Sequence, residues 1–252
     1  MNIAGFVKTS FVDYPGKIAS VVFTQGCNLR CGYCHNLSLL DTDYTAKGIP
    51  TEELFQWLSK RIGMIDAVVV SGGEPTLQKD LYGFIEGLKA MDLLVKLDTN
   101  GTNPDSLRRL LADNLLDFIA LDLKAPLSSY ERITRTKGLK LSSIIESVEI
   151  IKHSGVAYEF RTTLCPELEV EDISSIISDF EIASNYVVQS CRSTELRKAA
   201  KNKQNFRRLT LCFNRNSMLS LRGFGVSGND QLTGIGSSYL PLHSDRPDIM
   251  SL

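Results

Sequence analysis

Three cysteines lie within eight positions of one stretch, at Cys27, Cys31 and Cys34, and form a Cys-x3-Cys-x2-Cys motif. Gly26 and Gly32 relax the backbone around them, so all three thiols can turn toward one centre. Soft sulfur ligands select zinc, copper(I) or iron–sulfur clusters. The stretch therefore predicts a metal centre held by thiolates.

This trio is one ligand short of a closed site. A structural zinc site takes four ligands, commonly as well-separated pairs. His35 would need a strained local geometry to be the fourth ligand, because it directly follows Cys34. A [4Fe–4S] cluster normally takes four thiolates, so three would leave one iron open to an external ligand. An open position is typical of catalytic rather than structural metal sites.

The composition predicts a single α/β domain of ordinary size. The chain has 252 residues, 43% of them hydrophobic, and can bury a sizeable core. A net charge of −1 gives no global signature of nucleic-acid binding. We find no apolar run of membrane-spanning length and no basic-then-apolar leader at the N-terminus. We therefore expect a cytoplasmic protein without membrane or nucleic-acid partners, in which clustered cysteines bind metal or react.

Short apolar runs alternate with segments of helical periodicity along most of the chain. This alternation predicts right-handed βαβ units around a parallel sheet, and hence a partial, open α/β barrel of about six parallel strands. The expected strands are 18–23, 67–70, 93–97, 118–121, 156–164 and 186–188, and the expected helices are 51–62, 77–90, 104–111, 143–151 and 173–182.

Two of the expected helices carry recognisable start signals. Asn103 followed by Pro104 is typical of an N-cap and a first helical residue. Ser143 and Glu146 have the spacing of a capping box.

Regular alternation ends after residue 188, where the charge also changes. Residues 1–188 hold 18 basic and 25 acidic residues, whereas 189–252 hold ten and four. The second part has a basic segment, 197–208, and a Gly/Ser-rich segment, 223–238. We expect one domain over 1–188 and an irregular tail over 189–252. Two interpretations of the tail stay open: a partly disordered, basic partner-binding segment, or a sequence not native to the domain, such as a frameshift product.

Polar segments follow several of the expected strands. They are Ser71-Gly72-Gly73-Glu74-Pro75, Asp98-Thr99-Asn100-Gly101 and Asp122-Leu123-Lys124. Each alone has an ordinary explanation as a turn or a solvated charge. Active sites of parallel α/β folds lie at the carboxyl ends of the strands, however, and all three segments would share that edge with the cysteine stretch. The combination favours a functional site.

The same residues carry a family resemblance. The cysteine motif, with aromatic Tyr33 before its last cysteine, and Gly-Gly-Glu-Pro after the second strand resemble the radical S-adenosylmethionine (SAM) superfamily. Four further stretches are similar to the glycyl-radical-enzyme activases: Cys34-His35-Asn36, 71–78, 98–101 and 122–124. The stretch 9–17, Thr-Ser-Phe-Val-Asp-Tyr-Pro-Gly-Lys, and the whole of 1–188 resemble the branch that activates anaerobic ribonucleoside-triphosphate reductase. Nothing after Gln189 matches these activases.

The resemblance implies cofactors and partners. Cys27, Cys31 and Cys34 would hold three irons of a [4Fe–4S] cluster, and the fourth iron would bind SAM. One electron, from a reductant such as flavodoxin or ferredoxin, would cleave SAM to methionine and a 5′-deoxyadenosyl radical. That radical would take a hydrogen atom from a glycine of the partner enzyme.

The resemblance also implies residue roles toward SAM. Gly72 and Gly73 would let backbone approach its methionine part, and Glu74 would pair with its ammonium group. Lys124, with Asp122 beside it, would bind its carboxylate. The remaining candidates are Tyr33 and His35 for the adenosyl part, and Asp98 and Asn100 for the cofactor or the partner's glycine loop.

The sequence also contains weaker candidate residues and allows two alternative functions. Arg161 is a weaker candidate, equally well read as a structural arginine. Cys165, Cys191 and Cys212 have no ligand spacing. A radical SAM enzyme acting on a small molecule would share the central motifs, and a zinc-binding interaction module is the rival from another class.

Overall fold

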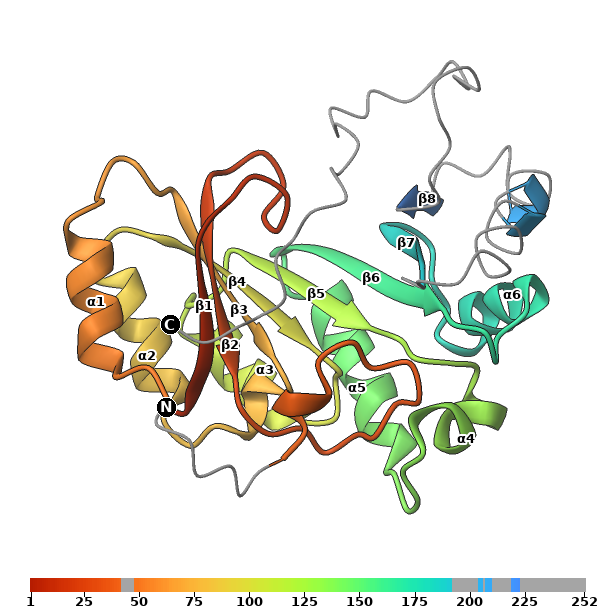
Figure 1. Cartoon of the computed structure of the whole chain (residues 1–252). Helices are drawn as coiled ribbons and strands as arrows, with labels where there is room; N and C mark the ends of the chain where they lie inside the picture. The colour runs from red at the N-terminus through yellow and green to blue at the C-terminus, as the bar shows by residue number, and fades with distance from the viewer. Residues whose placement is uncertain (42–47, 192–203, 206, 210–218, 223–252) are drawn as a thin grey trace.

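An open eight-stranded sheet runs through the protein in chain order (Figure 1). The computed structural model describes residues 1–41, 48–191, 204–205, 207–209 and 219–222. β1 pairs with β2 in antiparallel fashion, and every later neighbouring pair is parallel. The strands are β1 (Ile3–Ser10), β2 (Ala19–Thr24), β3 (Ala67–Gly72), β4 (Leu94–Thr99), β5 (Phe118–Asp122), β6 (Ala157–Leu164), β7 (Tyr186–Ser190) and β8 (Leu219–Arg222).

Helices connect the parallel strands and pack on one face of the sheet. They are α1 (Thr51–Ser59), α2 (Leu81–Lys89), α3 (Pro104–Ala112), α4 (Tyr130–Thr134), α5 (Leu141–Lys152) and α6 (Val170–Asp179), with single 3-10 turns at Leu37–Leu39, Pro75–Leu77 and Leu127–Ser129. The expected open α/β partial barrel is confirmed.

The strand count differs from the expectation at both edges of the sheet. All six expected strands are present, and β1 and β8 are added outside them. β8 lies within the expected irregular tail, where Leu219–Arg222 continues the parallel register from Tyr186↔Leu219 to Gln189↔Arg222. An edge strand of four residues is too short to show an alternation pattern, so it was missed. Apart from 189–191, 204–205 and 207–209, the rest of the tail lies outside the described residues, including most of 197–208 and all of 223–238. The boundary at 188 stays a prediction.

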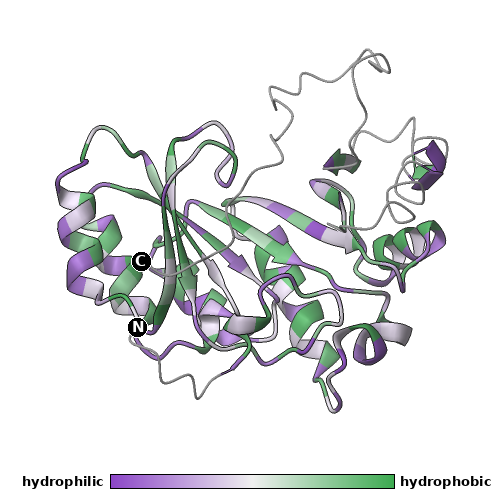
Figure 2. Ribbon diagram, viewed as in Figure 1, coloured by the Kyte–Doolittle hydropathy of each residue, from purple (hydrophilic) through white to green (hydrophobic). Residues whose placement is uncertain are grey.

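The sheet is buried on both faces near its centre. Ala67, Val68, Val69 and Val70 of β3 are completely buried. Val68 and Val70 belong to the large core between sheet and helices, whereas Ala67 and Val69 pack into a small cluster on the opposite, inner face. The strands are accordingly mostly hydrophobic, whereas the helices mix both kinds of residue (Figure 2). A strand covered on both faces explains the unbroken β-branched run.

The loop between β1 and β2 closes one end of the inner face. Tyr14 lies against Phe118, with ring centroids 5.7 Å apart. Lys96 Nζ donates a hydrogen bond of 2.7 Å to the backbone carbonyl of Asp13. Because Phe118 begins β5, this closure lies at the amino ends of the parallel strands and leaves their carboxyl ends accessible.

The structure confirms one of the two expected helix starts and contradicts the other. α3 begins at Pro104, and the Asn103 side chain caps it by accepting from the Ser106 N–H at 3.3 Å. α5 starts two residues before Ser143, so the expected capping box is wrong: Ser143 lies buried in the first turn. Leu139 and Leu141 pack against the main core, and this packing favours an earlier helix start than the local capping signal.

Among the described residues, no helix combines the length and the apolar character needed to cross a membrane.

Replacing Asn103 tests the cap of α3. Asn103 also donates to the Thr76 carbonyl at 2.9 Å, so it joins this helix to the segment after β3. We expect Asn103→Ala to lower the free energy of unfolding by about 1–2 kcal/mol, because both hydrogen bonds are lost. Asn103→Ser, which keeps an acceptor for the Ser106 N–H, should recover part of this loss. Urea denaturation measures both, and an alanine variant as stable as the serine variant would contradict the capping role.

Candidate functional site

A pocket of about 230 Å³ opens at the carboxyl ends of the parallel strands. The cysteine loop forms one wall, and the exits of β3, β4 and β5 form the others. The twelve site residues expected from the sequence all line it: Cys27, Cys31, Tyr33, Cys34, His35, Gly72, Gly73, Glu74, Asp98, Asn100, Asp122 and Lys124. The structure thus brings these residues together, while their roles toward a cofactor stay predictions.

The cysteine loop is tied to the body of the protein through its backbone. Arg30 donates its N–H to the Thr134 carbonyl at 3.0 Å, which anchors the loop to the end of α4. The Arg30 guanidinium folds back onto the Cys27 carbonyl at 2.6 Å. A tight turn from Cys31 to Cys34, with an N–H to carbonyl distance of 3.1 Å, sets the second half of the motif. These contacts hold the three cysteines on one wall of the pocket.

The three thiols are free, with no disulfide among them. Burial raises the pKa of the Cys27 thiol to about 11 and also raises the pKa of Cys31. A bound cation is therefore needed to hold these thiols as thiolates at neutral pH. Among the described residues, no three His, Cys, Asp or Glu side chains converge closely enough to share one metal ion. In an iron–sulfur cluster each thiolate binds an iron of its own, so the ligands need not converge in that way.

An orphan hydroxyl in the pocket also fits a missing ligand. The Tyr33 phenol oxygen is buried and has no hydrogen-bond partner among the described residues. Buried polar groups left unpaired are costly, so a ligand that reaches Tyr33 would relieve that cost. The soft donor set of three cysteines and this unpaired hydroxyl both fit an iron–sulfur cluster with an organic ligand on it.

The two glycines after β3 bring its end against the start of the cysteine loop. Gly72 has φ of 121°, a conformation that only glycine adopts readily. A Cβ at Gly72 would collide with the Thr24 backbone, and one at Gly73 with the Gly26 carbonyl. Hydrogen bonds from Gly73 N–H to Thr24 and from Glu74 N–H to Gly26, at 2.9 and 2.8 Å, lock this approach. The packing of the protein itself therefore requires glycine at positions 72 and 73.

Glu74 joins two of the strand exits and is completely buried. Its Oε1 accepts from the Thr76 N–H at 3.1 Å, the Thr76 hydroxyl at 2.5 Å and the Thr99 hydroxyl at 2.7 Å. Its Oε2 accepts from the Asn100 N–H at 2.7 Å. Burial raises the pKa of Glu74, although these four hydrogen bonds each favour its ionised form. The carboxylate thus fixes the end of β4 to the turn after β3.

Asn100 continues this connection to the cysteine loop. Its Nδ2 donates to the Asn28 side-chain oxygen at 2.9 Å, and its Oδ1 accepts from the Thr102 N–H at 3.0 Å. A chain of hydrogen bonds therefore runs from Glu74 through Asn100 to the residue that follows Cys27.

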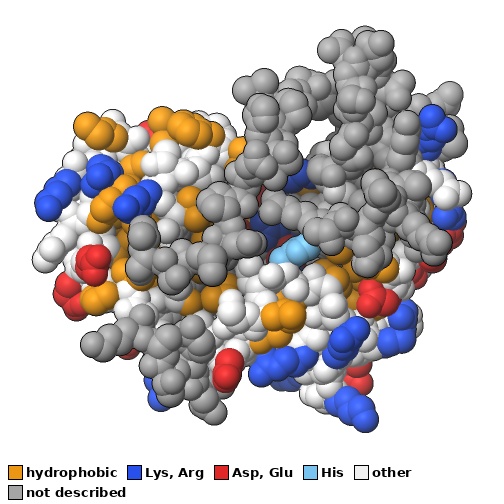
Figure 3. Space-filling view, viewed as in Figure 1, with side chains coloured by type: hydrophobic (Ala, Val, Ile, Leu, Met, Phe, Trp, Pro, Cys, Tyr) orange, Lys and Arg blue, Asp and Glu red, His pale blue; other side chains and the backbone are white. Residues whose placement is uncertain are grey.

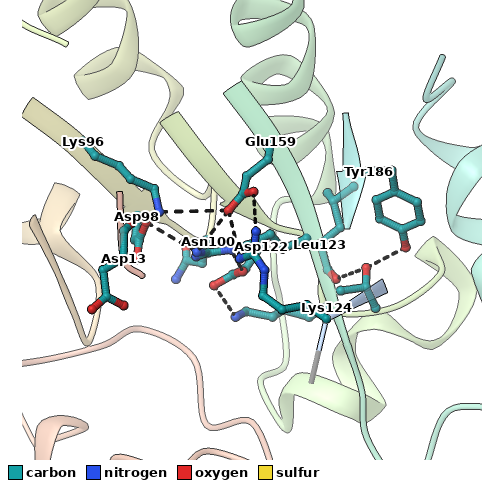
Figure 4. A network of polar contacts seen from close by, with 12 residues as sticks. Asp13, Lys96, Asp98, Asn100, Asp122, Leu123, Lys124, Glu159 and Tyr186 are labelled. Atoms are coloured by element: carbon teal, nitrogen blue, oxygen red, sulfur yellow. Dashed lines mark hydrogen bonds and ion pairs between the residues drawn. The ribbon is translucent and has the colours of Figure 1, made fainter. Parts of the chain in front are cut away.

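Charged side chains of β4, β5 and β6 lie close together, and two of them, Asp98 and Asp122, line the pocket (Figure 4). Arg161 Nε donates to Asp122 Oδ1 at 2.8 Å, and its Nη1 lies 3.5 Å from Asp98 Oδ1. Lys124 Nζ donates to Asp122 Oδ2 at 3.2 Å. Arg161 therefore connects two carboxylates of the site, which makes it a part of the site's electrostatics rather than an isolated arginine.

The two cations set the protonation of Asp122. Burial by itself would raise the pKa of this carboxyl, but the charges of Arg161 and Lys124 outweigh it and hold the pKa well below its usual range. Burial by itself would lower the pKa of Lys124, and the Asp122 charge reverses this, so the pKa of Lys124 lies well above its usual value. Both groups are charged at neutral pH.

Sequence reasoning missed three members of this network. Lys96 Nζ lies 3.3 Å from Asp98 Oδ1 and 4.0 Å from Glu159 Oε1, and Arg222 of β8 contacts Glu159 at 3.0 Å. A usable signal was present in the sequence. Lys96 and Asp98, like Glu159 and Arg161, stand two residues apart in otherwise apolar strands, and that spacing puts both members of each pair on one face.

The remaining cysteines lie outside the pocket lining. Cys165 and Cys191 are buried just beyond the ends of β6 and β7, and Cys212 lies outside the described residues.

A glutamine at position 74 tests the carboxylate that joins the exits. Glu74→Gln keeps the shape but places an NH2 group among N–H and O–H donors, so at least one buried donor loses its acceptor. We expect the free energy of unfolding to fall by about 1–3 kcal/mol in urea denaturation. The matched control is Glu86→Gln, an exposed position of α2, which should change stability little. Equal effects of both changes would argue against the role of Glu74.

The depressed pKa of Asp122 predicts a pH-dependent effect of Asp122→Asn. The ionised carboxylate stabilises the folded state above its unfolded pKa of about 3.9, and this contribution is lost as the pH falls further. At neutral pH the variant should be about 1–3 kcal/mol less stable, because Arg161 and Lys124 lose a partly buried partner. The gap from wild type should narrow as the pH falls below about 4. Urea denaturation across this range measures it, with exposed Asp105→Asn as control, and a constant gap would refute the assignment.

Comparison with known proteins shows which family this chain is similar to. The model of the radical SAM superfamily matches residues 21–180. A protein of Methanocaldococcus jannaschii assigned to the glycyl-radical enzyme activating enzymes is 34% identical over 195 residues, covering 74% of this chain and 78% of its own length. The pyruvate formate-lyase-activating enzyme of Clostridium pasteurianum is 33% identical over 165 residues, covering 62% of this chain and 66% of that protein.

One solved structure of the same fold contains bound SAM, which is also written AdoMet. Native anSMEcpe with bound AdoMet superposes with a TM-score of 0.58 at 18% identity, over 78% of this chain and 61% of that one. This likeness shows the shared fold. The superfamily's cofactors are a [4Fe–4S] cluster and SAM, which agree with the donor set and the orphan hydroxyl of the pocket. The chain therefore belongs to the radical SAM superfamily and is a radical SAM enzyme, with glycyl-radical enzyme activating enzymes among its relatives.

Proposed function

We propose that this protein activates a glycyl-radical enzyme, and that its partner is anaerobic ribonucleoside-triphosphate reductase. The observation that carries the proposal is the match to an activating enzyme over 74% of this chain. The radical SAM match over residues 21–180 includes every residue that lines the pocket. The similarity of 9–17 and of 1–188 to one activase branch supports the choice of partner. A reductant such as flavodoxin or ferredoxin and a cytoplasmic location complete the proposal.

When bound, the cluster and SAM supply reductive cleavage of the sulfonium and removal of a hydrogen atom from the partner's glycine. The protein's residues place the reactants. Cys27, Cys31 and Cys34, on the loop that Arg30 anchors, would hold the cluster and leave one of its irons open to SAM.

Charged side chains orient the methionine part of SAM in this proposal. Lys124 provides the cation for its carboxylate, and Asp122 holds Lys124 in place by their 3.2 Å contact. Glu74 provides the anion for its ammonium group. Because Oε1 of Glu74 already accepts three hydrogen bonds and Oε2 accepts one, Oε2 is the atom that has room for the ammonium.

The residues that flank Cys34 receive the adenosyl part in this proposal. They are Tyr33, whose hydroxyl has no partner among the described residues, and His35, and both line the pocket. Asp98 and Asn100 stand at the exit of β4, where they face either the cofactor or the incoming glycine loop. Exclusion of water from this space protects a reactive intermediate from side reactions.

Anaerobic reconstitution tests the proposed function. With iron and sulfide, we expect cluster absorption, reductive cleavage of SAM by dithionite, and a glycyl radical on added reductase by electron paramagnetic resonance. Cys31→Ala should abolish all three, because one cluster ligand is lost, whereas Cys165→Ala, outside the pocket, should keep them.

Different outcomes separate the rival functions. SAM cleavage without any glycyl radical on candidate partners would favour a radical SAM enzyme acting on a small molecule. Preferential uptake of zinc, without cluster absorption or SAM cleavage, would favour a zinc-binding module and refute the proposal.

A further inference from the structure

A basic surface adjoins the cysteine loop on its outer side. It consists of Arg30 of the loop, Arg132 of α4, and Arg135, Lys137 and Lys140 after α4, all of them exposed. We call it the α4 basic surface. Figure 3 shows Lys and Arg side chains gathered at the lower right of the molecule, over the region where Figure 1 places α4.

Two direct contacts join this surface to the cysteine motif. The Arg30 N–H lies 3.0 Å from the Thr134 carbonyl and 3.2 Å from the Thr136 hydroxyl, on either side of Arg135. The Arg135 guanidinium covers Gly32, so closely that a methyl group at Gly32 would collide with it. Since Gly32 lies between Cys31 and Tyr33, the Arg135 side chain stands over the backbone of the cluster loop.

The positive charge of this surface is poorly neutralised. Glu131 accepts backbone N–H groups of Gly138 and Leu139, and Glu167 lies 3.8 Å from Arg135. Within the described part of the chain, Arg132, Lys137 and Lys140 form no ion pair. Five cations and two carboxylates leave a surplus of three positive charges, on a chain whose formal net charge is −1.

Arg135 is held in place despite an unfavourable backbone. It ends α4 with φ of 51°, in the left-handed region that is unfavourable for a non-glycine residue. Glycine would fit this position better, so Arg135→Gly removes the guanidinium without adding strain.

We propose that the α4 basic surface docks an acidic one-electron carrier protein that reduces the cluster. The inference rests on the proposed function, because reductive cleavage of SAM needs one electron from outside the chain. That electron leaves the reduced carrier, which is oxidised by one electron, and enters the cluster, which is reduced by one. A carrier must come close to the cysteine loop, and the exposed stretch around Gly32 is bordered by these cations.

Charge complementarity suits this kind of encounter. Transient electron-transfer complexes have small interfaces, and opposite charges raise their association rates. Exposed charges are screened by salt, so docking should weaken as ionic strength rises. An acidic carrier therefore explains why Arg132, Lys137 and Lys140 form no ion pair within the described part of the chain.

The test compares two triple variants with the same change in charge. Arg132→Glu/Lys137→Glu/Lys140→Glu reverses the α4 basic surface without touching the pocket lining. Lys8→Glu/Lys17→Glu/Lys60→Glu reverses three exposed lysines on β1, in the β1–β2 loop and after α1. The probes are a flavodoxin and, separately, a ferredoxin, each presented to the full reconstituted chain.

Binding and reduction are measured separately. We expect the α4 triple variant to bind flavodoxin about tenfold more weakly at low salt, and cluster reduction by reduced flavodoxin to slow in parallel. The difference from wild type should shrink at high salt. Arg135→Gly should show a smaller loss in the same direction, and the control triple variant should behave as wild type. Dithionite, which needs no docking, should reduce every variant equally.

Several results would overturn the inference. One is equal carrier binding and equal reduction rates for the two triple variants. Another is a wild-type chain that binds neither carrier in a salt-dependent way. A third is normal cluster reduction combined with weakened glycyl-radical formation, which would assign the surface to the glycyl-radical enzyme instead. Failure of SAM cleavage with dithionite would count against the proposed function, whereas the binding measurements would still decide the docking surface.

Discussion

The site depends on the buried carboxylate of Glu74. Three separate segments end near it, and it accepts hydrogen bonds from Thr76, Thr99 and the Asn100 backbone. Asn100 then reaches Asn28 of the cysteine loop, so one acidic group sets the distances between three walls of the pocket. A neutral side chain of the same shape could not satisfy all of these donors. The two glycines before Glu74 allow this close approach, because any side chain there would collide with backbone of the neighbouring segment.

The ion network at the pocket serves a second purpose. Buried charges are costly unless they are paired, and here Arg161 lies between Asp98 and Asp122, while Glu159 contacts cations from β4, β6 and β8. The network keeps the Asp122 carboxylate ionised and Lys124 charged, so the pocket offers both signs of charge to a zwitterionic ligand. The network also includes β8, the last described strand, because Arg222 forms an ion pair with Glu159.

Much of this arrangement could be predicted from local pattern. The β-branched run at 67–70 indicates a strand buried on both faces, and Asn103-Pro104 indicates a helix start, because each signal depends on contacts within a few residues. Signals failed where distant packing decides. Ser143 and Glu146 have the spacing of a capping box, yet α5 begins earlier. Lys96 and Glu159 look like surface charges in isolation, and become site residues only because the curved sheet turns their strands inward.

The sequence by itself determined the chemistry: three closely spaced soft ligands, one short of a closed site, and polar exits after apolar strands. These features follow from residue type and from the fixed geometry of parallel strands, whose carboxyl ends share one edge. Tertiary structure alone decided which charges pair, that Arg161 links two carboxylates, and that Arg135 lies beside Gly32. Those outcomes depend on contacts between residues up to about a hundred positions apart, as in the Arg30 N–H to Thr136 hydroxyl contact, and no local spacing encodes them.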